Sequence, residues 1–279
     1  KSKIITTNRG GYPHGLIVII ITIISVFQNF TTTVTAVTPF ASSQIYEGLE
    51  NGPTLLNNIR FNDISNHWAR EPIQEVAAFS IMKGENNKLF RPNGTLTYAE
   101  ALTTLVRAIG KEGEAQMLAE QQLPPKIRDF VLLTVVEDWA KGYIQVAMQE
   151  GILTQEEENQ ILNLTPRQLA DIEYQVSEQL KDYKGENYTA GELTQIQNQV
   201  RDKLLHSSTW NKPVTRQQIA VWVARALEIE PSYGENIVKA NNFIDWRQID
   251  TEKLPLIETL LQKGYMQGMS STTFAPKGT

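Results

Sequence analysis

The stretch Trp68-Ala69-Arg70-Glu71-Pro72-Ile73 decides the fold, because the pattern that it opens occurs three times in the chain. In the first copy the pattern continues to Ser80-Ile81-Met82 and then to Gly84. The other two copies keep this order: Trp139-Ala140, Ile144 and Gly151-Ile152-Leu153 in the second, and Ile257, Gly264-Tyr265-Met266 and Gly268 in the third. Such repetition indicates one small supersecondary unit that buries its apolar face against its own copies.

A second segment completes the unit. Leu96-Thr97-Tyr98-Ala99-Glu100 precedes apolar residues at helical spacing, and Val214-Thr215-Arg216-Gln217-Gln218 does the same in the second copy. The unit is therefore predicted to be a helix, a glycine-containing loop and a second helix. The third copy runs from Phe274 to Thr279 in step with residues 90–95 and stops before its second helix. We expect its missing helix to lie in chain that follows.

These residues resemble the S-layer homology family. Its pattern is Phe-x-Asp near His-Trp-Ala, a Gly-Ile turn, Phe-x-Pro and then Thr-Arg-Ala-Glu. The first copy matches it best, with Phe61, Asp63, His67-Trp68-Ala69, Phe90-x-Pro92 and Thr97-Tyr98-Ala99-Glu100. It departs from the pattern at Ser80, where Gly is usual, and at Tyr98, where Arg is usual.

The resemblance implies an all-α fold of helix-loop-helix repeats in a pseudo-threefold arrangement. We expect the following division: signal peptide and cleavage region 1–41, linker 42–58, first repeat 59–112, second repeat 124–230 with an inserted helical hairpin at 154–211, and an incomplete third repeat 241–279. The insert holds two amphipathic stretches that begin with the capping patterns Thr165-Pro166-Arg167-Gln168 and Thr189-Ala190-Gly191-Glu192. We expect an antiparallel hairpin that projects from the repeats. It serves either as a spacer or as a protein contact, and its narrow apolar stripes favour the spacer.

The amino end predicts export. Lys1, Lys3 and Arg9 precede a short apolar run at residues 16–27, and small residues follow around Ala36 and Ala41. This order is typical of a cleaved secretory signal peptide, and the run is shorter than the roughly 20 apolar residues of a membrane-spanning helix. A retained anchor is the alternative.

Composition excludes several classes of function. The chain has no cysteine, so no disulfide, thiol catalyst or thiolate metal site is expected. Without residues 1–41, 23 Lys and Arg face 31 Asp and Glu, which argues against nucleic-acid binding and requires a local cationic site for any anionic polymer. The three histidines are far apart, at His14, His67 and His206, and no catalytic motif accompanies them. We expect no enzyme activity, no metal and no cofactor.

Candidate binding residues follow from the resemblance. In the family, the Arg after the repeat's Thr faces a groove between repeats and contacts secondary cell-wall polysaccharide, which often bears pyruvate ketals. Arg216 holds this position in the second repeat, and its guanidinium suits a carboxylate. Tyr98 holds it in the first, where it could stack on a sugar but cannot neutralise a charge. Glu100 and Gln218 have a simpler interpretation as partners of Thr97 and Thr215 in capping boxes.

The remaining candidates also have two interpretations each. Trp68 and Trp139 either pack in the core, which the residue type alone favours, or line a saccharide groove, as the resemblance suggests. Asp63 and Asp245 match the family's ligand-site Asp, or they cap a helix entry or a turn.

The resemblance therefore implies a secreted protein of the cell wall or S-layer, anchored without a covalent bond through secondary cell-wall polysaccharide in grooves between repeats. Two alternatives stay open. The repeats could be degenerate and assemble a surface layer or appendage through self-association or contacts with envelope proteins, or the chain could be the anchor part of a larger surface enzyme.

Overall fold

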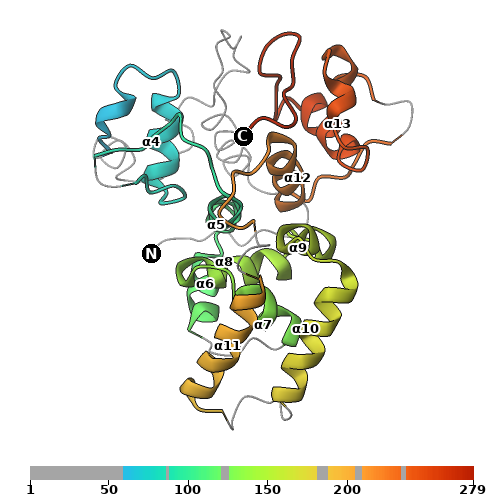
Figure 1. Ribbon diagram of the computed structural model, residues 1–279. Coiled ribbons are helices and arrows are strands. Elements are labelled where there is room, and N and C mark those ends of the chain that lie inside the picture. The colour runs from blue at the N-terminus through green and yellow to red at the C-terminus, as the bar shows by residue number, and fades with distance from the viewer. Residues whose placement is uncertain (1–58, 86–87, 121–125, 181–187, 205–208, 234–236) are drawn as a thin grey trace, which may run out of the picture. The chain divides into compact units, whose positions relative to one another are not determined.

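The computed structural model describes residues 59–85, 88–120, 126–180, 188–204, 209–233 and 237–279 (Figure 1). The predicted signal peptide and linker lie outside these residues. Over the described ranges every regular element is a helix and no strand occurs, which confirms the all-α class. Within the same ranges, no helix has the length and apolar character needed to span a bilayer.

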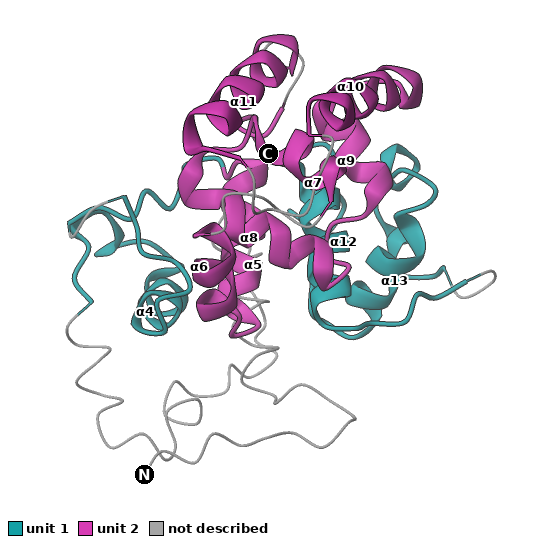
Figure 2. Cartoon of the chain, turned by 90° about the horizontal axis from the view of Figure 1, so that it is seen from below, with its two compact units in different colours: residues 1–95, 215–279 teal, residues 96–214 magenta. Residues whose placement is uncertain are grey.

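The chain divides into two compact units (Figure 2). Unit 1 comprises residues 1–95 and 215–279, and unit 2 comprises residues 96–214. The described elements of unit 1 are η1 (Asn62–Ile64), α4 (Arg70–Ala78), α12 (Arg216–Ala226), η3 (Ala240–Asn242), η4 (Trp246–Gln248) and α13 (Leu254–Gln262). Those of unit 2 are α5 (Tyr98–Ala108), α6 (Glu112–Ala119), α7 (Ile127–Leu133), α8 (Asp138–Gln149), α9 (Gln155–Leu162), α10 (Pro166–Gln179) and α11 (Ala190–Leu204). The pseudo-threefold arrangement of the repeats stays a prediction.

The first helices of the three copies, α4, α8 and α13, form as predicted. Each places its pattern isoleucine in the interior, and the three residues Ile73, Ile144 and Ile257 are fully buried. Each helix also ends at a residue in the left-handed conformation. Gly151 and Gly264 fill this position in two copies with φ of 68° and 70°, whereas Ser80 fills it in the first with φ of 59°. The left-handed turn therefore persists without glycine.

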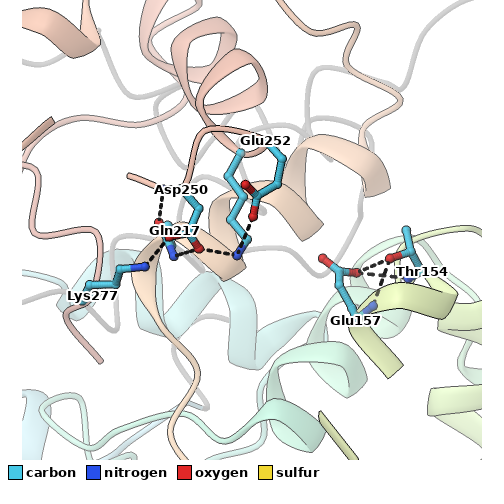
Figure 3. Close-up of polar contacts among 7 residues, drawn as sticks. Thr154, Glu157, Gln217, Asp250, Glu252 and Lys277 are labelled. Carbon is cyan, nitrogen blue, oxygen red and sulfur yellow. Dashed lines mark hydrogen bonds and ion pairs between the residues drawn. The ribbon is translucent and has the colours of Figure 1, made fainter. Parts of the chain in front are cut away.

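Capping boxes form at four helix starts, three of which were predicted. Thr97 with Glu100, Thr154 with Glu157 (Figure 3), and Thr165 with Gln168 exchange the reciprocal pair of hydrogen bonds at α5, α9 and α10, and Thr189 with Glu192 does so before α11. The prediction is wrong for Thr215, whose side chain makes no capping hydrogen bond to α12. Residues 276–278 supply the cap instead, because the Arg216 and Gln217 amides donate to the carbonyl oxygens of Gly278 and Pro276.

The inserted hairpin packs against the rest of unit 2. Helices α10 and α11 lie side by side (Figures 1 and 2), and their apolar seam is buried at Leu169, Ile172, Val176, Leu193, Ile196, Val200 and Leu204. Two arginines tie the hairpin to the α7 region. Arg128 pairs with Glu158 of α9 and Glu173 of α10, and the Arg201 Nε donates to the Thr134 carbonyl at 3.2 Å. These contacts hold the hairpin against the α7 region, and the buried apolar residues of α10 and α11 are not available to a partner protein.

Helices α6 and α8 approach each other closely at one glycine. A Cβ atom added to Gly142 would lie 1.8 Å from the carbonyl oxygen of Ala115, a separation that no side chain can occupy. The cluster of Arg107, Glu112 and Tyr143 closes the same interface, with the Tyr143 hydroxyl donating to Glu112 at 2.8 Å. Arg107 therefore pairs with an acidic neighbour.

Candidate functional site

Trp68 stands at the surface of unit 1. It immediately precedes Ala69 and α4, and 45% of its surface is exposed. His67 beside it accepts a hydrogen bond at Nδ1 from the Ala69 amide, 3.1 Å away, and its Nε2 lies 3.4 Å from Asn93 Oδ1. Because the amide can only donate, Nε2 must carry the hydrogen that points at Asn93. The imidazole and indole centroids are 5.5 Å apart, so His67 supports an aromatic pair at this turn.

Trp139 has a matching position in unit 2. It belongs to the first turn of α8, and 47% of its surface is exposed. Its Nε1 donates to Glu137 at 2.5 Å, and the other oxygen of Glu137 accepts from Asn211 Nδ2 at 3.3 Å. The core-packing interpretation of Trp68 and Trp139 is therefore wrong. Fixed contacts hold both indoles in place and leave a large part of each accessible.

Asp63 and Asp245 accept equivalent backbone hydrogen bonds in the first and third repeats. Asp63 accepts hydrogen bonds from the amides of Phe90, at 3.0 and 3.2 Å, and Arg91, at 2.7 Å. Asp245 accepts from the amides of Phe274 and Ala275, at 2.8 and 2.7 Å. Burial alone would raise the pKa of Asp63, but the backbone donors outweigh it and hold the pKa below its ordinary value. The turn-carboxylate interpretation accounts for both residues.

Tyr98 and Trp139 flank one segment of unit 2. The Tyr98 amide donates to the Lys212 carbonyl at 3.2 Å, while the preceding residue Asn211 contacts Glu137 beside Trp139. Burial, and then the charge of Glu157, raise the pKa of Tyr98, so its phenol stays protonated and can donate a hydrogen bond. The first repeat's ligand position is thereby joined, through residues 211–212, to the exposed indole of the second repeat. Glu100 is held in the capping box of α5, as its simpler interpretation predicts.

Arg216 lies in the interior of unit 1 and is 3% exposed. Its guanidinium donates to the carbonyl oxygen of Gln267, lies 3.7 Å from Met269 Sδ, and stacks over Phe274 with 5.0 Å to the ring centroid. Burial lowers its pKa to about 9 against the opposing influence of Asp245, so the side chain stays cationic at neutral pH. In this structure the third-repeat loop covers the group that the resemblance assigns to a ligand.

Gln217 and Asp250 form a polar cluster that sequence reasoning missed (Figure 3). The Gln217 Nε2 donates to Asp250 Oδ2 at 2.6 Å, and the Asp250 amide donates back to Gln217 Oε1 at 3.1 Å. Lys253 pairs with the same carboxylate at 2.7 Å, and Lys277 pairs with its other oxygen. Burial opposes the charge of Asp250, but the two ammonium groups prevail and lower its pKa to about 2. The only signal in the sequence was the departure itself, since Gln217 stands where the family pattern has Ala.

A comparison with family sequence models matches the first and third repeats. The sequence model of the S-layer homology domain matches residues 60–102 and 242–279. These two segments are S-layer homology domains. The matched segments contain Asp63 and Asp245, each of which accepts hydrogen bonds from two backbone amides, and the turn at Trp68.

Several curated proteins share parts of this sequence. The chain is 25% identical to an exoglucanase of Acetivibrio thermocellus over 80% of its own length and 15% of that protein. It is 29% identical to the surface-layer 125 kDa protein of Lysinibacillus sphaericus over 39% of its own length and 8% of that protein. It is 39% identical to a surface layer protein of Brevibacillus choshinensis over 23% of its own length and 6% of that protein. The chain therefore spans about a seventh or less of these relatives. No solved structure matches it.

The S-layer homology match indicates where the protein is located. S-layer homology domains attach proteins to the cell wall, so the chain is part of a secreted, cell-surface protein.

Proposed function

We propose that this chain attaches a secreted protein to the cell wall by binding secondary cell-wall polysaccharide, with Trp68 and Trp139 as stacking surfaces for sugar rings. The observation that carries the proposal is that these two indoles hold equivalent positions in two repeats and are nearly half exposed in both. Exposed indole costs hydrophobic free energy, about 25 cal/mol for each Å² left in water. A saccharide's apolar face would recover that free energy.

Hydrogen-bonding groups beside each indole support the same ligand. Asn93 lies next to the Trp68 turn, and Asn211 lies next to the Trp139 turn. Amides of this kind can bind sugar hydroxyls as donors and as acceptors. Tyr98, whose phenol remains a donor, contributes to the second of these positions.

A negatively charged group on the ligand would need a cationic partner in the protein. Arg216 remains the candidate partner for a pyruvate carboxylate, because it is the family's ligand position and is cationic at neutral pH. Reaching it requires displacement of the loop that contains Gln267 and Met269. We therefore assign primary recognition to the tryptophans and any recognition of pyruvate to Arg216.

Co-sedimentation with purified wall sacculi tests the proposal. Trp68→Ala and Trp139→Ala should each weaken retention several-fold, and the double variant should lose most of it, at unchanged melting temperature. Tyr174→Ala is the matched control, since this aromatic residue is 65% exposed and belongs to α10 of the inserted hairpin. Stripping the secondary polymer from the sacculi should abolish retention of the parent chain. Undiminished binding to stripped sacculi would refute the polysaccharide as ligand.

We also propose that this part of the chain attaches and does not catalyse. Two carboxylates of lowered pKa support this, because Asp63 binds backbone amides and Asp250 binds Gln217 and two lysines. Any hydrolytic activity of the chain on cell-wall or plant polysaccharide would contradict it. If retention depends on other surface proteins instead of polymer, the repeats serve assembly of a surface layer, which is the second candidate function.

A further inference from the structure

A cavity of about 710 Å³ lies within unit 2. Its walls come from α6, from the start of α7, from the second half of α8 and from the start of α9. Small-molecule sites usually have volumes of about 300–1,000 Å³. The cavity is therefore large enough for a ligand, and the side chains of its wall indicate which kind.

Gln145 of α8 brings a buried polar side chain to this wall. It is 6% exposed, and its Oε1 accepts no hydrogen bond from any residue that the structure describes. A buried polar atom without a partner is costly, and native proteins keep few of them. The same side chain also lines a smaller cavity of about 200 Å³. Its amide is thus in place to bind a polar group that enters either cavity.

Asp129 of α7 contributes a carboxylate to the wall of the larger cavity. The residue is half-buried, and burial raises its pKa against the opposing charges of Lys126 and Arg128, without a hydrogen bond to the carboxylate. Arg128 is engaged elsewhere, because its guanidinium binds Glu158 at 2.9 Å and Glu173 at 3.3 Å. The Asp129 oxygens can therefore accept hydrogen bonds from donors that a ligand supplies.

The wall favours a neutral ligand with several hydroxyl groups. Among the lining residues that the structure describes, the charges of Lys126 and Arg128 balance those of Asp129 and Glu158. A hydroxyl group both donates and accepts, so it can bind the Asp129 carboxylate and can satisfy the Gln145 amide in either orientation. Apolar surface for the C–H groups of a ring comes from Leu118, Met148 and Leu153.

We propose that this cavity binds a neutral sugar of one or two rings, with Gln145 and Asp129 as its hydrogen-bonding residues. The site differs from the stacking surface assigned to Trp139, which lies in the first turn of α8, whereas the cavity meets this helix at Gln145 and Met148. Occupancy of the cavity does not require the wall polysaccharide of the proposed function.

Titration of the full chain with cellobiose and with N,N′-diacetylchitobiose tests the site. The chain has five methionines, so methyl-13C methionine labelling gives few signals, and Met148→Leu identifies the one at the cavity. We expect the Met148 signal to move with a millimolar dissociation constant for at least one of the two sugars. Glucuronate should bind at least roughly fivefold more weakly, because its carboxylate would lie beside that of Asp129. No movement with either neutral sugar would overturn the site, and equally tight binding of glucuronate would overturn the neutral class of ligand.

Gln145→Leu removes the amide at similar side-chain volume. Because Oε1 has no partner in the described protein, the variant should keep or raise the melting temperature and weaken sugar binding by about tenfold. Gln197→Leu is the matched control, since it changes the same residue type in the wall of the smaller cavity, and it should leave binding unchanged. Undiminished binding by Gln145→Leu would overturn the assignment.

Two further variants keep the test decisive. Asp129→Asn should weaken binding several-fold even if Gln145→Leu folds poorly, and unchanged affinity of Asp129→Asn would remove Asp129 from the site. The double variant Trp68→Ala/Trp139→Ala should retain the full movement of the Met148 signal. Loss of that movement would assign the sugar to the tryptophans and overturn the cavity as its site, whatever the outcome of co-sedimentation with sacculi.

Discussion

Gln217 and Asp250 exchange two hydrogen bonds that join the first turn of α12 to the segment before α13. Lys277 binds the same carboxylate, so one aspartate connects three stretches of unit 1 from the second and third repeats. The Ala of the family pattern at position 217 could make neither of the two hydrogen bonds to Asp250.

Gln217→Ala should therefore destabilise the fold by about 1–2 kcal/mol, since it leaves Asp250 with less hydrogen bonding. Urea unfolding followed by circular dichroism measures the loss. Gln179→Ala, at an exposed position of α10, is the control and should change stability by less than about 0.5 kcal/mol. Equal effects of the two variants would show that the cluster contributes nothing.

Ser80→Gly should stabilise the protein by about 1 kcal/mol, because a residue with a Cβ atom is strained at a φ of 59°. Gly151→Ser is the reciprocal change at the equivalent position of the second repeat. A Cβ at Gly151 would meet no atom within 4 Å, so its expected loss of about 1 kcal/mol reports backbone conformation alone. The prediction fails if the two melting temperatures shift in the same direction.

Gly142→Ala should cost about 2–4 kcal/mol, because the new methyl group would force α6 and α8 apart at Ala115. Gly113→Ala on α6 is the matched control. A Cβ there meets nothing within 4 Å, and replacing a helical glycine should stabilise the protein by about 0.5–1 kcal/mol. Thermal unfolding of both variants separates packing from helix propensity, and a neutral Gly142→Ala would contradict the observed approach of the helices.

Glu75 should make stability depend on pH. Burial, and then the charge of Glu71, raise the pKa of Glu75 to about 7 from the ordinary 4.5. The folded state binds this proton more tightly than the unfolded state, so the contribution is most favourable below pH 4.5 and is lost as the pH rises to 7. Glu75→Gln should remove this slope and raise stability at pH 8 by about 1–2 kcal/mol, because solvent screening reduces the full effect of the pKa shift. Denaturant midpoints between pH 4 and 8 test it, with the exposed Glu71→Gln expected to give a smaller gain. Parallel profiles for Glu75→Gln and the parent chain would exclude the effect.

Repetition was enough to predict the helical units, since Ile73, Ile144 and Ile257 recur at a fixed distance before a left-handed turn and all three are buried. The capping boxes were equally local, because Thr and Glu three residues apart need only each other. The cap of the helix after Thr215 could not be predicted in this way, because it comes from residues about 60 positions away. A local sequence pattern covers only the first few residues of a helix.

The candidate site was harder to predict for the same reason. Residue type favours a buried tryptophan, but exposure depends on which elements happen to cover the indole, and Trp68 and Trp139 lie at helix starts that remain uncovered. Arg216 shows the opposite case, where a residue assigned to the surface by resemblance is covered by the Gln267 to Phe274 loop. In both cases the deciding contacts come from distant sequence.

The cap that Gly278 and Pro276 place on α12 also makes the sequence repeat a poor unit for protein expression. A fragment cut at the end of the second repeat keeps every residue of α12 yet loses the acceptors for its first two amides. These contacts join residues about 60 positions apart, so the cap on the first turn of α12 cannot form before residues 276–278 are in place. During synthesis from the ribosome, the first two amides of α12 would lack these acceptors until residue 278 has emerged, which couples capping of the second repeat to translation of the third.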